Sequence, residues 1–162
     1  MKLTSPEFNA EQMLPLSFQA DQENASPELH WDDVPDGVKS FAVAMHDSDA
    51  PTGGAGWWHW FVYNLPADLR SLPHNAGNLS GSHLPNGAIT LANDGNVKAY
   101  GGCLPPIGDP AHRYVFTVYA LPKMLDENDI PANAQTSYAG FVVNATAIDK
   151  ASLMAYYERP KK

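Results

Sequence analysis

Proline and glycine are scattered along the whole chain, and this limits the folds that are open to it. The 162 residues include 14 prolines and 12 glycines. Because proline breaks helices and both residues favour turns, the chain divides into short elements, which disfavours a helical bundle. Turn signals at 35–37, 86–87 and 94–95 separate strand-like segments. The spacing therefore predicts a mainly β protein.

Four segments have the residue pattern of β-strands. Residues 39–46 alternate apolar and small side chains, while residues 58–65 are apolar on both faces and are expected to form a central buried strand. Residues 113–121 are rich in β-branched and aromatic residues, which favour strands. Apolar side chains alternate over residues 14–18 and predict one more, half-buried strand.

The C-terminal region contains two different periods. Residues 138–148 have small and apolar side chains, no proline and a helical stripe, and residues 151–158 alternate as a strand does. We expect a helix followed by a terminal strand. Asp149 leaves an alternative open, because it could equally cap a second short helix.

Composition indicates one ordered domain over residues 1–162. The chain is 44% hydrophobic and 17% charged, and it contains no internal repeat, low-complexity tract or linker. Recurrent strands with turns between them favour an antiparallel β-sandwich, Greek-key-like in layout, with a few short peripheral helices.

Net charge and apolar runs limit the partners that the sequence predicts. A formal charge of −8 disfavours a broad footprint on nucleic acid or anionic lipid. The chain contains no run of about 18 apolar residues, so no membrane-spanning segment is expected. The N-terminus also lacks an apolar stretch of signal-peptide length. We therefore predict a cytoplasmic protein. Cys103 is the only cysteine, so no disulfide can form within the chain.

Three short segments concentrate the chemically active side chains. They cover residues 46–51, 57–60 and 101–114, each next to a strand-like run. Loops at strand ends are where a rigid scaffold usually carries its binding groups. These segments together therefore suggest a small pocket for a polar, anionic ligand, although spacing alone does not show that they meet.

Strand alternation divides the side chains of these segments by face. Trp57 and His59 share one face, so Trp58 and Trp60 are expected to point away from the pocket, into the core or an interface. By the same rule His112 and Tyr114 share a face. Arg113 then lies on the opposite side, where a structural ion pair is the expected role. His46 leaves its strand on the face opposite Met45 and is a weaker candidate for the site.

The same segments carry paired signatures that resemble the phosphatidylethanolamine-binding protein family, in particular its bacterial, kinase-inhibitor-like branch. One signature is Asp-x-Asp-Ala-Pro at 47–51, followed by Trp-x-His at 57–59. The other is Gly-x-x-Pro-Pro-x-Gly-x-x-x-His-Arg-Tyr at 102–114. The resemblance extends over roughly residues 14–159. Ser48 stands where the family usually has proline, and Cys103 and Leu104 replace smaller residues.

The resemblance implies two antiparallel sheets and a pocket for phosphate or phosphoryl-ethanolamine-like anions. Its binding residues, carried over by motif, would be Asp47, Asp49, Ala50, Pro51, Trp57, His59, Gly102, His112 and Tyr114. It also implies that the protein could modulate a protein kinase or protease. No cofactor or metal is implied.

Elementary chemistry suggests how such a pocket would bind an anion. The imidazole N–H groups of His59 and His112, the Tyr114 hydroxyl and backbone N–H groups of the loops can all donate to phosphate oxygens. Asp47 would orient one imidazole and favour its protonated form. Asp49 would hold its loop or accept the ammonium group of a ligand. Anion affinity should therefore fall as pH rises through the histidine titration.

Two other functions remain open at this stage. A hydrolase could use Asp47, His59 and His112 as metal ligands, or Cys103 as a nucleophile with His112, although the chain lacks the His-x-His and His-x-x-x-His pairs that anchor metals. Cys103, in a glycine-rich and potentially exposed loop, is expected to be a passive thiol. The resemblance to the family's bacterial branch also implies a homodimer, and aromatic residues near 57–63 and 156–157 permit, but do not require, an apolar interface.

Overall fold

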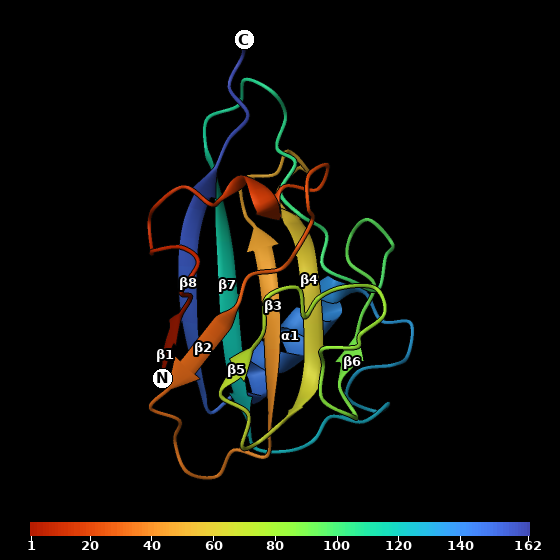
Figure 1. The fold of residues 1–162 in the computed structure, drawn as a ribbon. Coiled ribbons are helices and arrows are strands. Elements are labelled where there is room, and N and C mark those ends of the chain that lie inside the picture. Colours follow the sequence, from red (N-terminus) through yellow and green to blue (C-terminus); the bar gives the residue numbers. More distant parts are fainter.

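Two antiparallel β-sheets pack face to face, and one α-helix covers the outer face of the larger sheet (Figure 1). The computed structural model describes residues 1–162. The smaller sheet has the strand order β1 (Lys2–Thr4), β2 (Leu29–Asp32), β5 (Ser71–Leu72). The larger sheet has the order β6 (Ile89–Thr90), β4 (Trp57–Pro66), β3 (Ser40–Asp47), β7 (His112–Leu121), β8 (Asp149–Tyr157). The predicted mainly β fold with two antiparallel sheets is confirmed.

Alternation along β3 and β7 divides the core into two layers. Phe41, Val43 and Met45 join the layer between the two sheets, with Trp31 of β2 packing against Phe41. The residues between them on β3, such as Ala44, face the second layer under helix α1 (Thr136–Thr146). Burying apolar side chains on both faces of a sheet removes its central strands from water. The predicted buried strands 58–65 and 113–121 correspond to β4 and β7.

A register irregularity in β4 changes the faces predicted for its tryptophans. Met45 pairs with Trp60, whereas the next residue, His46, pairs with Trp58, so one β4 residue between them has no partner of its own on β3. This is the geometry of a β-bulge, which reverses the alternation beyond it. Trp58 accordingly packs toward α1, but Trp60 is buried between the sheets, on the same side as His59. The prediction that Trp58 and Trp60 share a face was wrong.

The strand predicted over residues 14–18 was also wrong. Residues Leu16–Phe18 form a short 3₁₀-helix, and Leu16 is exposed. Pro15 precedes it and has no N–H group for a strand ladder. Leu14 donates its backbone N–H to Tyr156 at 2.8 Å, so the segment touches the edge of β8 at one point before it turns.

The C-terminal order of helix and strand is confirmed. Helix α1 ends at Thr146 and β8 begins at Asp149, so Asp149 does not cap a second helix. Its carboxylate instead binds the N-terminal amine of Met1 at 2.9 Å. No helix in the structure has the length and apolar character needed to cross a membrane.

Antiparallel pairing brings the three predicted segments to one edge of the larger sheet. The C-terminal residue of β3, Asp47, lies opposite Trp57 at the start of β4 and opposite Tyr114 near the start of β7. The loops that leave these strand ends therefore meet at the upper edge in Figure 1. The sheet register thus supplies the convergence that spacing could not show.

Candidate functional site

A cavity of about 530 Å³ lies at this edge of the larger sheet. Eight of the nine candidate residues from the sequence line it: Asp47, Ala50, Pro51, Trp57, His59, Gly102, His112 and Tyr114. Its other polar lining residues include Asn24, Asn93 and Tyr100, which the sequence analysis did not single out. Several apolar or proline side chains complete the wall, among them Val97, Leu104, Pro105 and Pro106.

Asp49 is the candidate that does not line the cavity. Its carboxylate accepts hydrogen bonds from Nε of Arg113 at 2.9 Å and from Nη2 at 2.7 Å, and also from the backbone N–H of Arg113. Hydrogen bonding to this guanidinium lowers the pKa of Asp49 to about 2. Asp49 therefore ties the loop after β3 to β7, and Arg113 has the ion-pairing contact expected of it.

His112 is held between two carboxylates. Its Nδ1 donates to Oδ2 of Asp47 at 2.7 Å, and its Nε2 donates to Oδ2 of Asp109 at 2.9 Å. Burial works against the charged ring, but the hydrogen bonds to Asp47 and Asp109 outweigh it, so the pKa of His112 is raised. Asp47 also accepts the backbone N–H of Asp49 at 2.8 Å, which fixes the carboxylate that orients the ring.

His59 is held by backbone groups instead. Its Nδ1 lies 2.7 Å from the carbonyl oxygen of Gly101, and the backbone N–H of Gly101 donates to the His59 carbonyl at 2.8 Å. The ring is buried, with 6% of the residue exposed, and its Nε2 has no hydrogen-bond partner. Burial lowers the pKa of His59, although the Gly101 carbonyl partly opposes the shift. The surroundings of the two histidines thus shift their pKa values in opposite directions.

Tyr114 lies beside both histidines and also lines the cavity. Its ring centroid is 5.4 Å from that of His59 and 6.4 Å from that of His112. The Tyr114 hydroxyl is buried without a hydrogen-bond partner. Burial raises the pKa of Tyr114, so the hydroxyl keeps its proton and can act as donor or acceptor.

The glycine-rich loop beside the cavity uses its backbone N–H groups within the protein. Those of Gly101, Gly102 and Cys103 donate to the His59 carbonyl, the Asn24 side chain and the Phe18 carbonyl. An added Cβ at Gly102 would lie 2.3 Å from the Phe18 oxygen, so this close packing requires glycine. The expectation that these loop N–H groups are free to bind an anion was wrong, because the loop is anchored through them.

Asp109 is the most important residue that the sequence analysis missed. It lies three residues before His112, and its carboxylate accepts a hydrogen bond from Nε2 of that ring, an N–H group that the sequence offered to a ligand. The only sequence signal is an acidic residue within the second signature, and loop conformation decides whether it reaches the ring. His46 was a weaker candidate, and it lies outside the cavity, where its ring contacts the Ala55 carbonyl at 3.0 Å and the Trp58 ring.

Two further observations bear on the hydrolase alternative. Cys103 is fully buried, and burial raises its pKa, which disfavours the nucleophilic thiolate and agrees with the passive thiol expected from the sequence. No three side chains of histidine, cysteine, aspartate or glutamate are grouped so that they could hold a metal ion.

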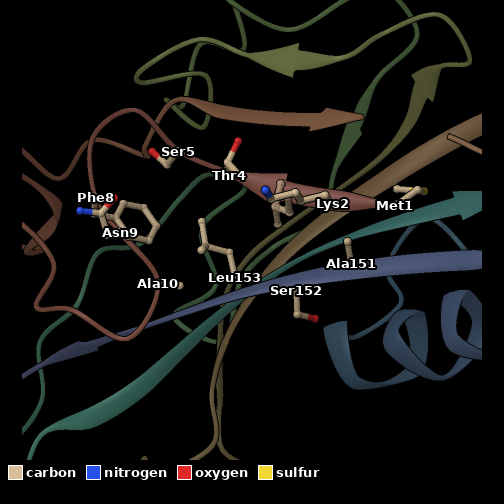
Figure 2. Close-up of a pocket in the computed structure, with 11 residues that line it drawn as sticks. Met1, Lys2, Thr4, Ser5, Phe8, Asn9, Ala10, Ala151, Ser152 and Leu153 are labelled. Atoms are coloured by element: carbon tan, nitrogen blue, oxygen red, sulfur yellow. The ribbon is translucent and has the colours of Figure 1, made fainter. Parts of the chain in front are cut away.

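A second hollow of about 400 Å³ lies between β1 and β8 (Figure 2). Its lining residues, which include Phe8, Asn9, Ser152 and Leu153, contain no histidine, cysteine or carboxylate. The cavity at the edge of the larger sheet is therefore the better candidate for a functional site.

The family model described as phosphatidylethanolamine-binding protein matches residues 4–158. The chain belongs to the phosphatidylethanolamine-binding protein family. Its relative YbcL of Escherichia coli is 40% identical over 162 residues, which cover 97% of this chain and 87% of that protein. YbhB of Escherichia coli is 45% identical over 138 residues, covering 85% of this chain and 84% of YbhB.

Two solved structures are similar in fold to this chain. The crystal structure of YbcL, described as a new member of the mammalian family, matches with a TM-score of 0.91 over 97% of both chains. A carboxypeptidase Y inhibitor, complexed with its cognate proteinase, is 20% identical and matches with a TM-score of 0.54 over 92% of this chain and 76% of the inhibitor. The similarity to the carboxypeptidase Y inhibitor shows a shared fold and nothing more.

Two of the three departures from the usual family signatures, Ser48 and Leu104, occupy different positions. Leu104 lines the cavity and is 46% exposed, so its side chain shapes the mouth. Ser48 is exposed in the turn after β3 and is not a lining residue. Of the two substitutions, Leu104 is the one positioned to contact what enters the cavity.

Proposed function

We propose that this protein is a non-enzymatic binding protein whose cavity takes phosphate or a phosphoryl-headgroup anion. The observation that carries the proposal is the meeting of His59, His112 and Tyr114 in one cavity with two buried polar atoms left unpaired. Buried polar atoms in proteins nearly always have a partner, so unpaired atoms on two residues that line a cavity favour a polar ligand.

The charges around His112 suggest how an anion is accommodated. The imidazolium carries one positive charge and lies between the carboxylates of Asp47 and Asp109. Asp47 is buried, whereas 37% of the Asp109 side chain is exposed. An anionic oxygen that replaces Asp109 at Nε2 keeps the number of negative groups around the ring unchanged. In this proposal the Asp109 carboxylate occupies the position of the ligand until it is displaced.

Competition by Asp109 gives a direct test. Removing the competing carboxylate in Asp109→Ala should strengthen binding of O-phosphoethanolamine about tenfold, measured by isothermal titration calorimetry at pH 6. Asp68→Ala is the matched control, because Asp68 is exposed just beyond the far end of β4 and its loss changes the net charge equally. Wild-type affinity should fall as pH rises through the raised pKa of His112, where the ring loses its proton.

Two results would contradict the proposal. Equal affinities in wild type and Asp109→Ala would remove the displacement step. No heat of binding from phosphate or O-phosphoethanolamine in either protein would remove the anion site altogether.

The remaining sequence predictions belong to the same proposal. Modulation of a kinase or protease is carried over from the family resemblance, and a cytoplasmic homodimer is likewise a prediction, with sedimentation velocity as the test of the dimer. The hydrolase is not carried further, since no observation in the site favours it.

A further inference from the structure

The second hollow lies beside a sheet edge that is only partly paired. β8 is the last strand of the larger sheet, and β1 is the last strand of the smaller one. Figure 2 shows Leu153 pointing from β8 into the hollow, whereas Ser152 points to the other side, toward α1. An edge strand presents backbone N–H and C=O groups that can pair with another chain.

The second half of the β8 edge is paired within the protein. Glu11 donates its backbone N–H to the Met154 carbonyl at 2.8 Å. The N–H and C=O of Tyr156 bind the backbone of residues 12–14 at 2.9 and 2.8 Å. These bonds also show that the backbone groups of Met154 and Tyr156 point away from β7, because successive residues of a strand turn these groups to opposite edges.

The first half of the same edge is open. By that alternation the N–H and C=O of Ser152, the C=O of Lys150 and the N–H of Met154 all point away from β7. None of these groups has a hydrogen-bond partner in the structure, and Ser152 is exposed. The open edge covers about five residues, the usual length of a short strand.

The hollow gives this edge a side-chain pocket of about 400 Å³. Its apolar surface includes Leu3, Phe8 and Leu153. The ion pair between the Met1 amine and Asp149 lies at the start of β8. At the other end, residues 8–11 cross over to the β8 edge. The recess is therefore limited to a short segment of chain.

The charges beside the open edge favour an acidic segment. Lys2 is the only charged side chain in the lining, and it is exposed. Lys150 is also exposed, and its Nζ binds the uncharged amide oxygen of Asn144 at 2.9 Å. The Asp149 carboxylate is already bound to the Met1 amine. Screening limits exposed charges to about 10 Å, so these local cations matter more than the net charge of −8.

A second copy of the chain does not fit this edge. In an antiparallel pair of β8 strands centred on Ser152, the second half of each strand would face the first half of the other. Residues 11–14 of each copy already occupy that second half. They would stand between the two strands and prevent the pairing.

We propose that the open edge from Lys150 to Met154 binds a short extended segment of a partner protein in which apolar and acidic residues alternate. The segment adds a strand to β8, so the free backbone groups of Ser152 gain partners. Its apolar side chains enter the hollow beside Leu153, and its acidic side chains lie near Lys150 and Lys2. This surface is separate from the proposed anion site, so either can fail without the other.

The test is a ¹H–¹⁵N NMR titration of the full chain with the peptide Ac-Val-Asp-Val-Asp-Val-amide. We expect saturable shifts at the amides of residues 150–154 and 1–5, largest at Ser152. Two analogues carry N-methyl groups on the valines or on the aspartates. Because an added strand uses the N–H groups of one edge only, one analogue should bind at least tenfold more weakly and the other should bind like the parent.

Variants assign the binding to this edge. Ser152→Pro removes an N–H that β7 does not use, so it should abolish binding, and proline is tolerated on edge strands. Ser152→Ala is the control, because it loses only the hydroxyl contact with Thr117 and should bind normally. Unchanged binding of O-phosphoethanolamine by Ser152→Pro would show that the variant is folded. Lys2→Glu should weaken binding about threefold, and Lys162→Glu, in the C-terminal tail, should not.

Three results would overturn the inference. They are the absence of shifts at residues 150–154, equal binding of both methylated analogues, and normal binding by Ser152→Pro. Shifts at residues 150–154 that grow with protein concentration alone would instead assign the edge to a second copy of the chain and contradict the proposed occupant.

Discussion

His59 on β4 and His112 on β7 flank the same central strand, β3, yet the two sides of the cavity hold their rings in opposite ways. On the β4 side, the His59 ring donates a hydrogen bond from Nδ1 to a backbone carbonyl, and its Nε2 has no partner. On the β7 side carboxylates take both nitrogens. Both residues are almost fully buried, so burial alone does not decide which ring is charged. The hydrogen-bond partner of each ring decides this, because a carboxylate compensates the cost of burying a cation and a backbone carbonyl does not.

The two sides should therefore respond to pH with opposite signs. The pKa of His112 is raised, so its contribution to stability is complete below about pH 6.5 and is lost as pH rises through its folded pKa. The pKa of His59 is lowered, so its neutral ring contributes fully above about pH 6.5, and that contribution is lost as pH falls through its folded pKa. The two histidines together therefore contribute most to stability near pH 6.5.

The largest loss of stability is expected when the buried carboxylate on the β7 side of the cavity is removed. Asp47→Asn removes the buried charge that compensates His112, and we expect the free energy of unfolding to fall by about 3 kcal/mol at pH 6 in urea denaturation. The loss of stability above pH 6.5 should become smaller in the same variant. Asp109→Asn is the control, because it removes the other, more exposed carboxylate and should cost about 1 kcal/mol or less. Equal losses in the two variants would contradict the assignment of Asp47 as the buried partner.

A smaller effect is expected on the β4 side. His59→Gln should lower the free energy of unfolding by about 1 kcal/mol at pH 7, because the hydrogen bond to Gly101 is weakened. Below pH 6.5 the difference from wild type should shrink, since the variant has no ring to protonate. His83→Gln, at an exposed histidine, is the matched control. A difference from wild type that grows at low pH would show that His59 is charged in the folded protein.

The smallest loss of stability is expected for Asp49, which can be compared with Asp47 in the same stretch of chain. Asp49 is two residues from Asp47, but its partner Arg113 is exposed, and exposed ion pairs contribute little to stability. Asp49→Asn should therefore lower the melting temperature much less than Asp47→Asn. Because the pKa of Asp49 is lowered to about 2, its contribution should disappear as pH falls from about 4 toward 2. Melting curves of both variants at pH 3 and pH 7 measure this difference.

The long strands and the helix could be predicted because each repeats its pattern over many residues. β3, β4, β7 and β8 have 8, 10, 10 and 9 residues, long enough for the alternation of β3 and β8 and the apolar, β-branched and aromatic runs of β4 and β7 to be visible in the sequence. β5 and β6 have 2 residues each, too few for a period. The bulge in β4 could not be predicted, because it depends on how β4 pairs with β3. This is why Trp60 was assigned to the wrong face.

The composition of the candidate site was easier to predict than its electrostatics. Eight candidate residues line the cavity because the signatures lie at strand ends that the sheet register brings together. The state of each histidine depends on contacts that no local pattern encodes. His59 meets a carbonyl 42 residues away, and His112 meets Asp47 across 65 residues. The opposite directions of the two pKa shifts therefore follow only from the folded structure.

The most direct test of this account is the titration of the two rings by ¹H–¹⁵N NMR, with His59→Gln used to assign the signals. The account predicts that His59 is neutral at pH 6.5 with its hydrogen on Nδ1 and that its pKa lies below 6.5. It predicts that His112 is protonated on both nitrogens at that pH, with a pKa above 6.5. A pKa of His59 equal to or above that of His112, or a neutral His59 with its hydrogen on Nε2, would contradict the account.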